Sequence, residues 1–166
     1  NLEKNNIVVN VQGDEPFIDP QDINNLAELI GRKKEADIAT LFSEITEEQK
    51  DDPNIVKLWI DRNNNIKGFS RNKDKIDRLD LKVHRHIGIY AYRVCFLKEF
   101  VSLSQTPGEI SENLEQLRAL ENNKVIVGVS STSKIHVGVD TQADLELARS
   151  KVHDDWYKAK FLFKNI

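Results

Sequence analysis

The chain has 166 residues, of which 39% are hydrophobic and 31% are charged, and its formal net charge is −3 at pH 7. This length fits one compact domain with a sizeable core, and the balance is that of a folded globular protein rather than a disordered one. No apolar run approaches the ~20 residues of a membrane-spanning helix, and the slight negative charge argues against a general nucleic-acid binder.

The first half of the chain predicts strands with one clearly marked helix between them. Residues 7–11 predict a strand covered on both faces, because they are apolar apart from Asn10 and rich in β-branched side chains. A helix follows, with Asp19 as its N-cap, Pro20 in its first turn and Gly31 at its exit. The next segments predict a strand at 37–42, a polar loop at 43–53, a hairpin of 55–60 with 66–69, and a strand at 87–92.

The second half begins with a single cysteine, Cys95, which lies in an apolar run and is predicted to be a buried free thiol. Residues 106–109 read as a capping box, and they predict one helix whose apolar stripe is Ile110, Leu114, Leu117 and Leu120. A strand at 124–129 and a short apolar run at 135–139 follow, and Thr141 then caps a final helix that extends to about Val152.

Together these elements predict an α/β fold with an open, mixed and mostly parallel sheet, helices on both faces and a hairpin excursion. The chain contains no internal repeat or low-complexity linker, so residues 1–166 are predicted to form a single domain. Methionine is absent even at position 1, and the chain opens almost directly on a strand, so we expect it to lack its beginning.

Two aspartates follow strands at the positions where open α/β sheets bind ligands. Asp14 comes after the strand at 7–11, and Asp140 comes after the run at 135–139. Two carboxylates at neighbouring strand ends suit Mg²⁺ held together with substrate phosphates. The structural alternative for each aspartate is a simple helix cap, but the pair favours a metal site.

A cationic stretch lies in the middle of the chain, where residues 71–86 carry six Lys or Arg against three Asp. Arg71 follows a predicted strand, and its planar guanidinium matches a carboxylate with two hydrogen bonds. The lysines of this stretch are read as solvated surface charges. His86 and Tyr90 are four apart in a predicted strand and so point to the same face, either as sugar ligands or as a half-buried structural pair.

Five segments resemble, in order and content, the bacterial 3-deoxy-manno-octulosonate cytidylyltransferases, or CMP-Kdo synthetases. They are "VNVQGDEPFI", "FSR", "HRHIGIYAYR", "NLEQLRALEN" and "VGVDTQADLELAR", and the resemblance runs from about residue 6 to residue 149. It implies a nucleotide-diphospho-sugar transferase-like fold and the transfer of CMP from CTP to the eight-carbon acid sugar, with release of pyrophosphate, for lipopolysaccharide synthesis.

The resemblance also implies a Mg²⁺ cofactor, a homodimer, a cytoplasmic location, and no nucleic-acid or membrane partner. It makes Asp14 and Asp140 the catalytic metal ligands. The positions that it implies for the sugar pocket are Gln12, Arg71, Arg78, His86, Tyr90, Glu115 and Gln116. Without the resemblance, helical position alone would place Glu115 and Gln116 toward solvent.

The N-terminal portion of the family, with the basic loop that holds the CTP triphosphate, has no counterpart in this sequence. We therefore expect residues 1–166 to be the C-terminal part of a nucleotidyltransferase domain, inactive alone. Two other interpretations stay open. One is a related nucleotidyltransferase or glycosyltransferase that uses another sugar, and the other is a non-catalytic sugar-binding subunit.

Overall fold

The protein is described by a computed structural model that covers residues 3–77, 81–133, 138–139 and 141–151. Within these ranges the apolar segments form a six-stranded sheet in the order β4-β3-β5-β2-β6, and β1 also pairs with β5. The strands are β1 (Ile7–Asn10), β2 (Ile38–Ser43), β3 (Lys57–Ile60), β4 (Ile66–Ser70), β5 (Val83–Arg93) and β6 (Ile126–Ser130). The predicted hairpin is confirmed as the antiparallel pair β3–β4.

The open, mixed sheet is confirmed, but the prediction that it is mostly parallel is wrong for the described strands. Among them only β2 and β6 pair in parallel, while β5 runs antiparallel to β1, β2 and β3. Since β1 and β2 both run opposite to β5, they share one direction, as a helical crossover between them requires. The long strand β5 lies between β1 and β2 and pairs with both. The two strands therefore do not pair with each other in parallel, as the alternation of strands and helices suggested.

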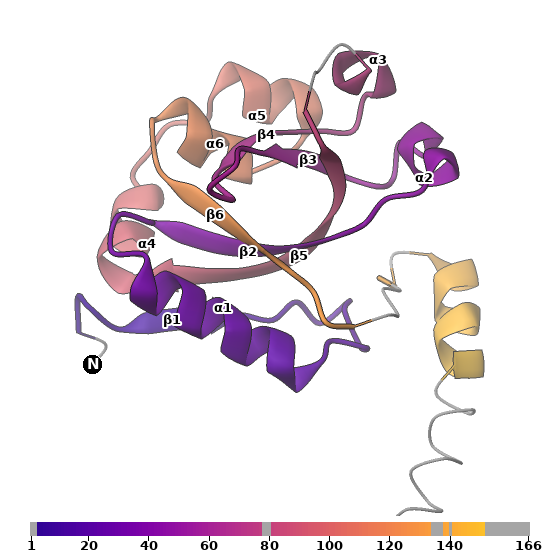
Figure 1. Ribbon diagram of the computed structural model, residues 1–166, viewed down its shortest axis with the longest axis horizontal. Helices are drawn as coiled ribbons and strands as arrows, with labels where there is room; N and C mark the ends of the chain where they lie inside the picture. The colour runs from indigo at the N-terminus through magenta and orange to yellow at the C-terminus, as the bar shows by residue number, and fades with distance from the viewer. Residues whose placement is uncertain (1–2, 78–80, 134–137, 140, 152–166) are drawn as a thin grey trace, which may run out of the picture.

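Helices cover both faces of the sheet, as predicted. One face packs on helix α1 (Pro20–Arg32), through a core that includes Leu26, Ile30 and Ile89. The other face packs on α4 (Val94–Phe100), α5 (Pro107–Glu112) and α6 (Gln116–Glu121), through a core that includes Phe69 and Phe96. Figure 1 shows α1 below the sheet and α5 with α6 above it.

Helix α1 begins as the sequence predicts, because the side chain of Asp19 accepts a hydrogen bond from the backbone N–H of Gln21 and Pro20 occupies the first turn. It ends at Arg32 rather than at Gly31, so Gly31 lies inside the last turn. The guanidinium of Arg93 donates to the carbonyl oxygens of Ile30, Lys33 and Ala36, and these bonds satisfy the C-terminal end of the helix.

The predicted loop at 43–53 contains a short helix, α2 (Glu47–Asp51). Thr46 and Gln49 form a reciprocal capping box, with both hydrogen bonds at 3.2 Å, and this motif marks the start of the helix within the polar segment. A further short helix, α3 (Lys73–Ile76), follows β4. Residues 142–151 are helical, and the predicted cap is confirmed because Thr141 and Asp144 exchange hydrogen bonds.

The predicted single helix over the stripe from Ile110 to Leu120 is wrong. Asn113 adopts the left-handed conformation (φ 53°, ψ 49°), and it ends α5 three residues before α6 begins. Ile110 is consequently 66% exposed rather than part of the core. The break turns the backbone between the two helices, so residues 113–116 are presented at a junction rather than along a helix flank.

Cys95 is exposed, so the prediction of a buried thiol is wrong. The apolar run around it forms the first turn of α4, where Val94 and Phe96 face the core and Cys95 faces outward.

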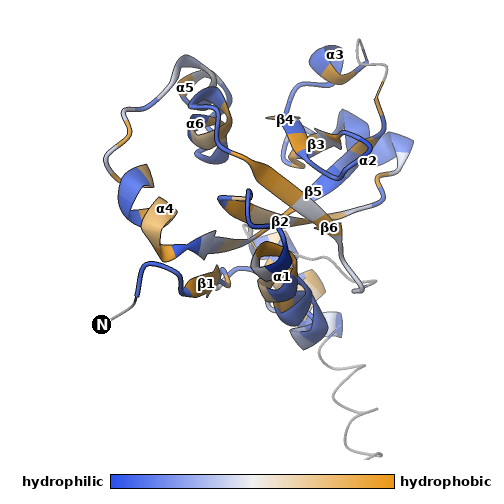
Figure 2. Ribbon diagram, turned by 60° about the vertical axis from the view of Figure 1, so that its left-hand side comes forward, coloured by the Kyte–Doolittle hydropathy of each residue, from blue (hydrophilic) through white to orange (hydrophobic). Residues whose placement is uncertain are grey.

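Hydropathy follows the same division between inside and outside, and Figure 2 shows hydrophobic colour along β6 and hydrophilic colour over α2. In the part of the chain that the structure describes, no helix has the length and apolar character to cross a membrane.

Candidate functional site

The edge of β5 changes partner along its length, and the candidate site lies around this change. Asn10 at the end of β1 pairs with Tyr90, whereas β3 begins to pair at Arg85. The loop after β1 and the end of β4 therefore approach the same stretch of β5 from two directions. Divergence of neighbouring strands is the place where open α/β sheets form ligand crevices.

Arg71, which directly follows β4, is held on three sides. Its backbone N–H donates to the carboxylate of Glu112 at 3.0 Å, and its carbonyl oxygen accepts from the buried ammonium of Lys57 at 3.0 Å. Its guanidinium Nη1 donates to the carbonyl oxygens of Asn54 at 2.8 Å and Pro53 at 3.3 Å. The Nε and Nη2 donors make no hydrogen bond within the described residues, so they remain available to an anionic ligand.

Glu112 connects this strand end to α5. Its carboxylate also accepts from the hydroxyl of Ser70 at 2.8 Å and from the ammonium of Lys75 at 3.4 Å. Burial raises the pKa of Glu112, but the hydrogen bonds from Arg71 and Ser70 and the charge of Lys75 outweigh it, and the net pKa is lowered. The carboxylate is therefore held in its charged form beside Arg71.

His86 and Tyr90 point to the same face of β5, as predicted, with their ring centroids 5.5 Å apart. The His86 ring also packs edge-on against Phe69 at 5.1 Å, and its Nε2 lies 3.0 Å from the hydroxyl of Thr40. Burial, assisted by the positive charge of Arg71, lowers the pKa of His86 to about 3. His86 is therefore a neutral hydrogen-bonding group at physiological pH.

The junction of α5 and α6 places the acidic side chain of Glu115 near Tyr90. Burial raises the pKa of Tyr90 above its usual value, and the negative charge of Glu115 adds to the effect, so these two groups lie within electrostatic reach. Glu115 is exposed, while its neighbour Gln116 is buried at the start of α6. Helical position alone would have placed Gln116 toward solvent, and it fails here because the break at Asn113 starts a new helix with Gln116 turned inward.

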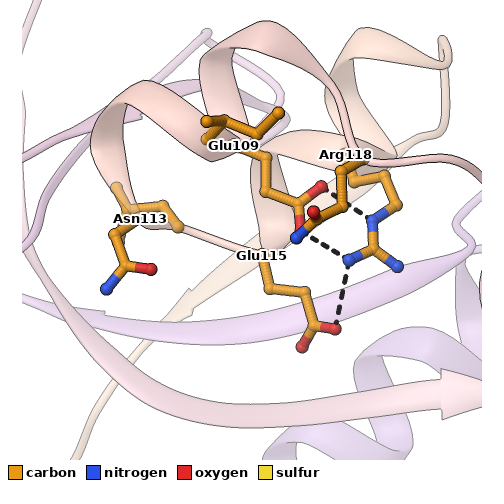
Figure 3. A pocket seen from close by; sticks show the side chains of 7 residues that line it. Glu109, Asn113, Glu115 and Arg118 are labelled. Atoms are coloured by element: carbon orange, nitrogen blue, oxygen red, sulfur yellow. Dashed lines mark hydrogen bonds and ion pairs between the residues drawn. The ribbon is translucent and has the colours of Figure 1, made fainter.

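A pocket of about 410 Å³ opens beside this junction. Its floor is the ion pair of Glu109 and Arg118, in which Arg118 Nε donates to the carboxylate at 2.8 Å. Glu115 lies 3.5 Å from the same guanidinium, and Asn113 forms part of the rim. Figure 3 shows that Arg118 is turned toward both carboxylates. The hydrogen bonds from Arg118 lower the pKa of Glu109, so this carboxylate is held in its charged form beside the guanidinium.

The loop after β1 carries Gln12 and Asp14, and both side chains are exposed. The Asp14 carbonyl oxygen accepts a hydrogen bond from the N–H of Val139 at 2.8 Å, so the segment that leads toward Asp140 in the sequence lies against this loop. The segment after β6 is also held to α1, because the buried carboxylate of Asp22 accepts a hydrogen bond from the Thr132 N–H at 2.8 Å. Asp140 itself lies outside the described residues.

The structure thus brings together four of the predicted sugar-side positions, Arg71, His86, Tyr90 and Glu115. Gln116 is buried next to Glu115 in the chain. Gln12 and Asp14 follow β1, whose last residue, Asn10, pairs with Tyr90. Arg78 lies outside the described residues. Sequence reasoning missed three polar residues that hold the site: Thr40, Lys57 and Glu112. Thr40 and Lys57 are polar residues with apolar neighbours, in "IATLF" and "VKLWI", and this was the available signal for them. Glu112 stands between Ser111 and Asn113, and its neighbours give no such signal.

The chain is similar in sequence to known cytidylyltransferases. A family model described as cytidylyltransferase matches residues 1–126. The 3-deoxy-manno-octulosonate cytidylyltransferase of Francisella tularensis subsp. novicida is 44% identical over 86% of this chain and 61% of its own length. The enzyme of that name from Saccharophagus degradans is 43% identical over 91% of this chain and 65% of its own length. The chain thus spans less than two thirds of these curated relatives.

Solved structures show the same similarity. A CMP:2-keto-3-deoxy-manno-octonic acid synthetase complexed with CTP superimposes with a TM-score of 0.79 at 30% identity, over 90% of this chain and 62% of that one. A putative glucose-1-phosphate thymidylyltransferase from Bacillus anthracis shares the fold, with a TM-score of 0.59 at 19% identity over 90% of this chain and 56% of its own. By the family model and these similarities, the chain belongs to the cytidylyltransferase family.

Proposed function

We propose that the whole protein to which this chain belongs transfers CMP from CTP to 3-deoxy-D-manno-octulosonate, for lipopolysaccharide synthesis. A hydroxyl oxygen of the sugar attacks the α-phosphorus and forms a new P–O bond. The bond from that phosphorus to the bridging oxygen breaks, pyrophosphate leaves, and the hydroxyl proton is released. No protein nucleophile is needed, so the residues act by positioning both substrates and balancing their charge.

The observation that carries this proposal is the arrangement of charge around β5. Arg71 is fixed by three sets of hydrogen bonds and keeps free N–H groups, which suits the carboxylate of an acid sugar. His86 and Tyr90 lie beside it with uncharged polar atoms, which suit sugar hydroxyls. A neutral sugar would leave the charge of Arg71 without a partner.

We propose Asp14 and Asp140 as the ligands of Mg²⁺. The side chain of Asp14 makes no hydrogen bond or ion pair within the described residues, and no group of three or more potential ligands occurs among them. This donor set fits Mg²⁺, which is typically bound by one or two carboxylates together with substrate phosphates. When bound, the ion neutralises phosphate charge and lowers the pKa of the attacking hydroxyl.

The test is release of pyrophosphate from CTP by the whole protein, with and without Mg²⁺, in the presence of the acid sugar. We expect release with 3-deoxy-manno-octulosonate and none with a neutral hexose or a hexose 1-phosphate. Release with a sugar phosphate but not with the acid sugar would identify a different nucleotidyltransferase. Binding of the acid sugar without any turnover would instead identify a non-catalytic subunit.

Because the chain spans 61% to 65% of its relatives, we propose that residues 1–166 alone do not turn over CTP. The same assay on the isolated chain checks this, and turnover by it would refute the proposal.

We further propose a homodimeric, cytoplasmic enzyme, on the resemblance alone. Light scattering of the whole protein, and fractionation of the cells that make it, test these two statements.

A further inference from the structure

The pairing of β2 with β5 contains a bulge beside the candidate site. Thr40 faces Tyr90, but the next residue of β2, Leu41, faces Ile87, so Gly88 and Ile89 have no partner in β2. A bulge of this kind leaves backbone groups outside the ladder. Here the hydroxyl of Thr40, which is fully buried, donates to the carbonyl oxygen of Ile89 at 2.9 Å.

This bond determines where the proton of His86 lies. A threonine hydroxyl has one hydrogen to donate, and the Ile89 carbonyl is only an acceptor. If the hydroxyl donated to His86 Nε2 instead, two acceptor oxygens would face each other at 2.9 Å with no proton between them. The arrangement that satisfies both contacts has the hydroxyl donating to Ile89 and His86 Nε2–H donating to the hydroxyl at 3.0 Å.

The other ring nitrogen, Nδ1, is then an acceptor. Within the described residues Nδ1 makes no hydrogen bond. It is also absent from the fully buried polar atoms without a partner, so part of its surface is accessible. His86 is 9% exposed, and Nδ1 is the nitrogen that solvent or a ligand can reach. Its neighbours Phe69 and Tyr90 are uncharged at neutral pH, and the nearest cation that affects it is Arg71.

We propose that Thr40 is a positioning residue that fixes His86 as the neutral Nε2–H tautomer, so that Nδ1 accepts a hydrogen bond from a substrate hydroxyl. This inference rests on the proposed function for the identity of the sugar, and it assigns two different tasks at the site. Arg71 donates to the sugar carboxylate, and His86 accepts from a hydroxyl. A carboxylate placed at Nδ1 would bring two acceptors together, so the sugar is bound in one orientation.

Nitrogen NMR of the whole protein labelled with ¹⁵N-histidine tests the tautomer directly, without turnover. His86→Gln identifies the signals of His86, and long-range proton–nitrogen correlations then distinguish the two neutral forms from the cation. We expect a neutral Nε2–H ring in the unmodified protein and in Thr40→Ser, which keeps the hydroxyl. We expect this preference to be lost in Thr40→Val, which has a similar shape without the hydroxyl.

An Nδ1–H ring or a cation in the unmodified protein would overturn the inference, whether or not Thr40→Val folds. In kinetics, Thr40→Val should raise the KM for the acid sugar about tenfold, the effect of one lost hydrogen bond, with little change in the KM for CTP. Thr40→Ser should restore it, and equal effects on both substrates would contradict the assignment. A protein that never activates the acid sugar would refute the proposed function but leave the tautomer result standing.

Discussion

The two ends of the candidate site are held in different ways. Around Arg71, side chains from three elements converge: the ammonium of Lys57 in β3, the hydroxyl of Ser70 in β4 and the carboxylate of Glu112 in α5. Around Asp14, the contacts within the described residues are backbone hydrogen bonds, such as that from Val139, and the side chain is exposed. The end around Arg71, which is the proposed sugar end, is therefore preformed, whereas the side chain of Asp14 is not held by its neighbours in the described residues.

This contrast predicts the largest effect at Asp14. In the whole protein, Asp14→Asn removes the charge of one proposed metal ligand, and we expect kcat/KM to fall about a thousandfold, corresponding to ~4 kcal/mol of transition-state stabilisation. Steady-state pyrophosphate release measures it. Asp19→Asn is the matched control, because it removes the same charge nearby yet keeps a good N-cap for α1. Equal losses in both variants would refute the metal role.

At the sugar end, Arg71→Lys keeps the charge but loses the planar fork. We expect the KM for the acid sugar to rise about thirtyfold, since a charge-assisted hydrogen bond contributes ~2 kcal/mol. The KM for CTP should change by less than about threefold. Initial-rate measurements with each substrate varied in turn provide the comparison. A rise confined to CTP would place Arg71 at the nucleotide instead.

Glu112→Gln tests how firmly the sugar end is preformed. The lowered pKa of Glu112 means that its charged form stabilises the fold at pH values above its unfolded pKa of about 4.3, and that this stabilisation is lost as the pH falls through the lower folded value. We expect a loss of ~1–2 kcal/mol in unfolding free energy at pH 7 and a smaller difference below about pH 4. Urea unfolding at both pH values measures it, and a difference independent of pH would exclude the charge as the cause.

Lys73→Gln should have the smallest effect, although Lys73 is only two residues from Arg71. Its ammonium pairs with Asp51 on the surface, where both side chains are largely exposed and solvent screens the interaction. We expect no measurable change in the unfolding midpoint or in either KM. A clear rise in the KM for CTP would show that this surface contributes to nucleotide binding.

Local patterns predicted those elements whose signals are local. The N-cap of α1 and the β3–β4 hairpin follow from residues within a few positions of each other. The break at Asn113 was not predicted, because the apolar stripe continues through it and only the conformation of that residue ends the helix. The order of strands around β5 was also missed, since apolar alternation does not encode which strands pair.

The site divides in the same way. Motif resemblance indicated Arg71 and His86, but it gave no reason to select Glu112 or Thr40. Glu112 meets Ser70 across 42 positions of sequence, and Thr40 meets His86 across 46. Such contacts exist only once the sheet has formed, so no local spacing reports them.

The central place of β5 also governs the order in which the chain can fold during synthesis. Strands β1, β2 and β3 all pair with β5, and Ile7 pairs with Arg93. Until β5 begins to leave the ribosome, the β3–β4 hairpin is the only strand pair among the described residues that can close. Ribosomes add ~5–20 residues per second, so the apolar residues of β1 and β2 remain without their sheet partner for several seconds. A pause in translation before β5 would prolong that exposure, whereas a pause after β5 would not.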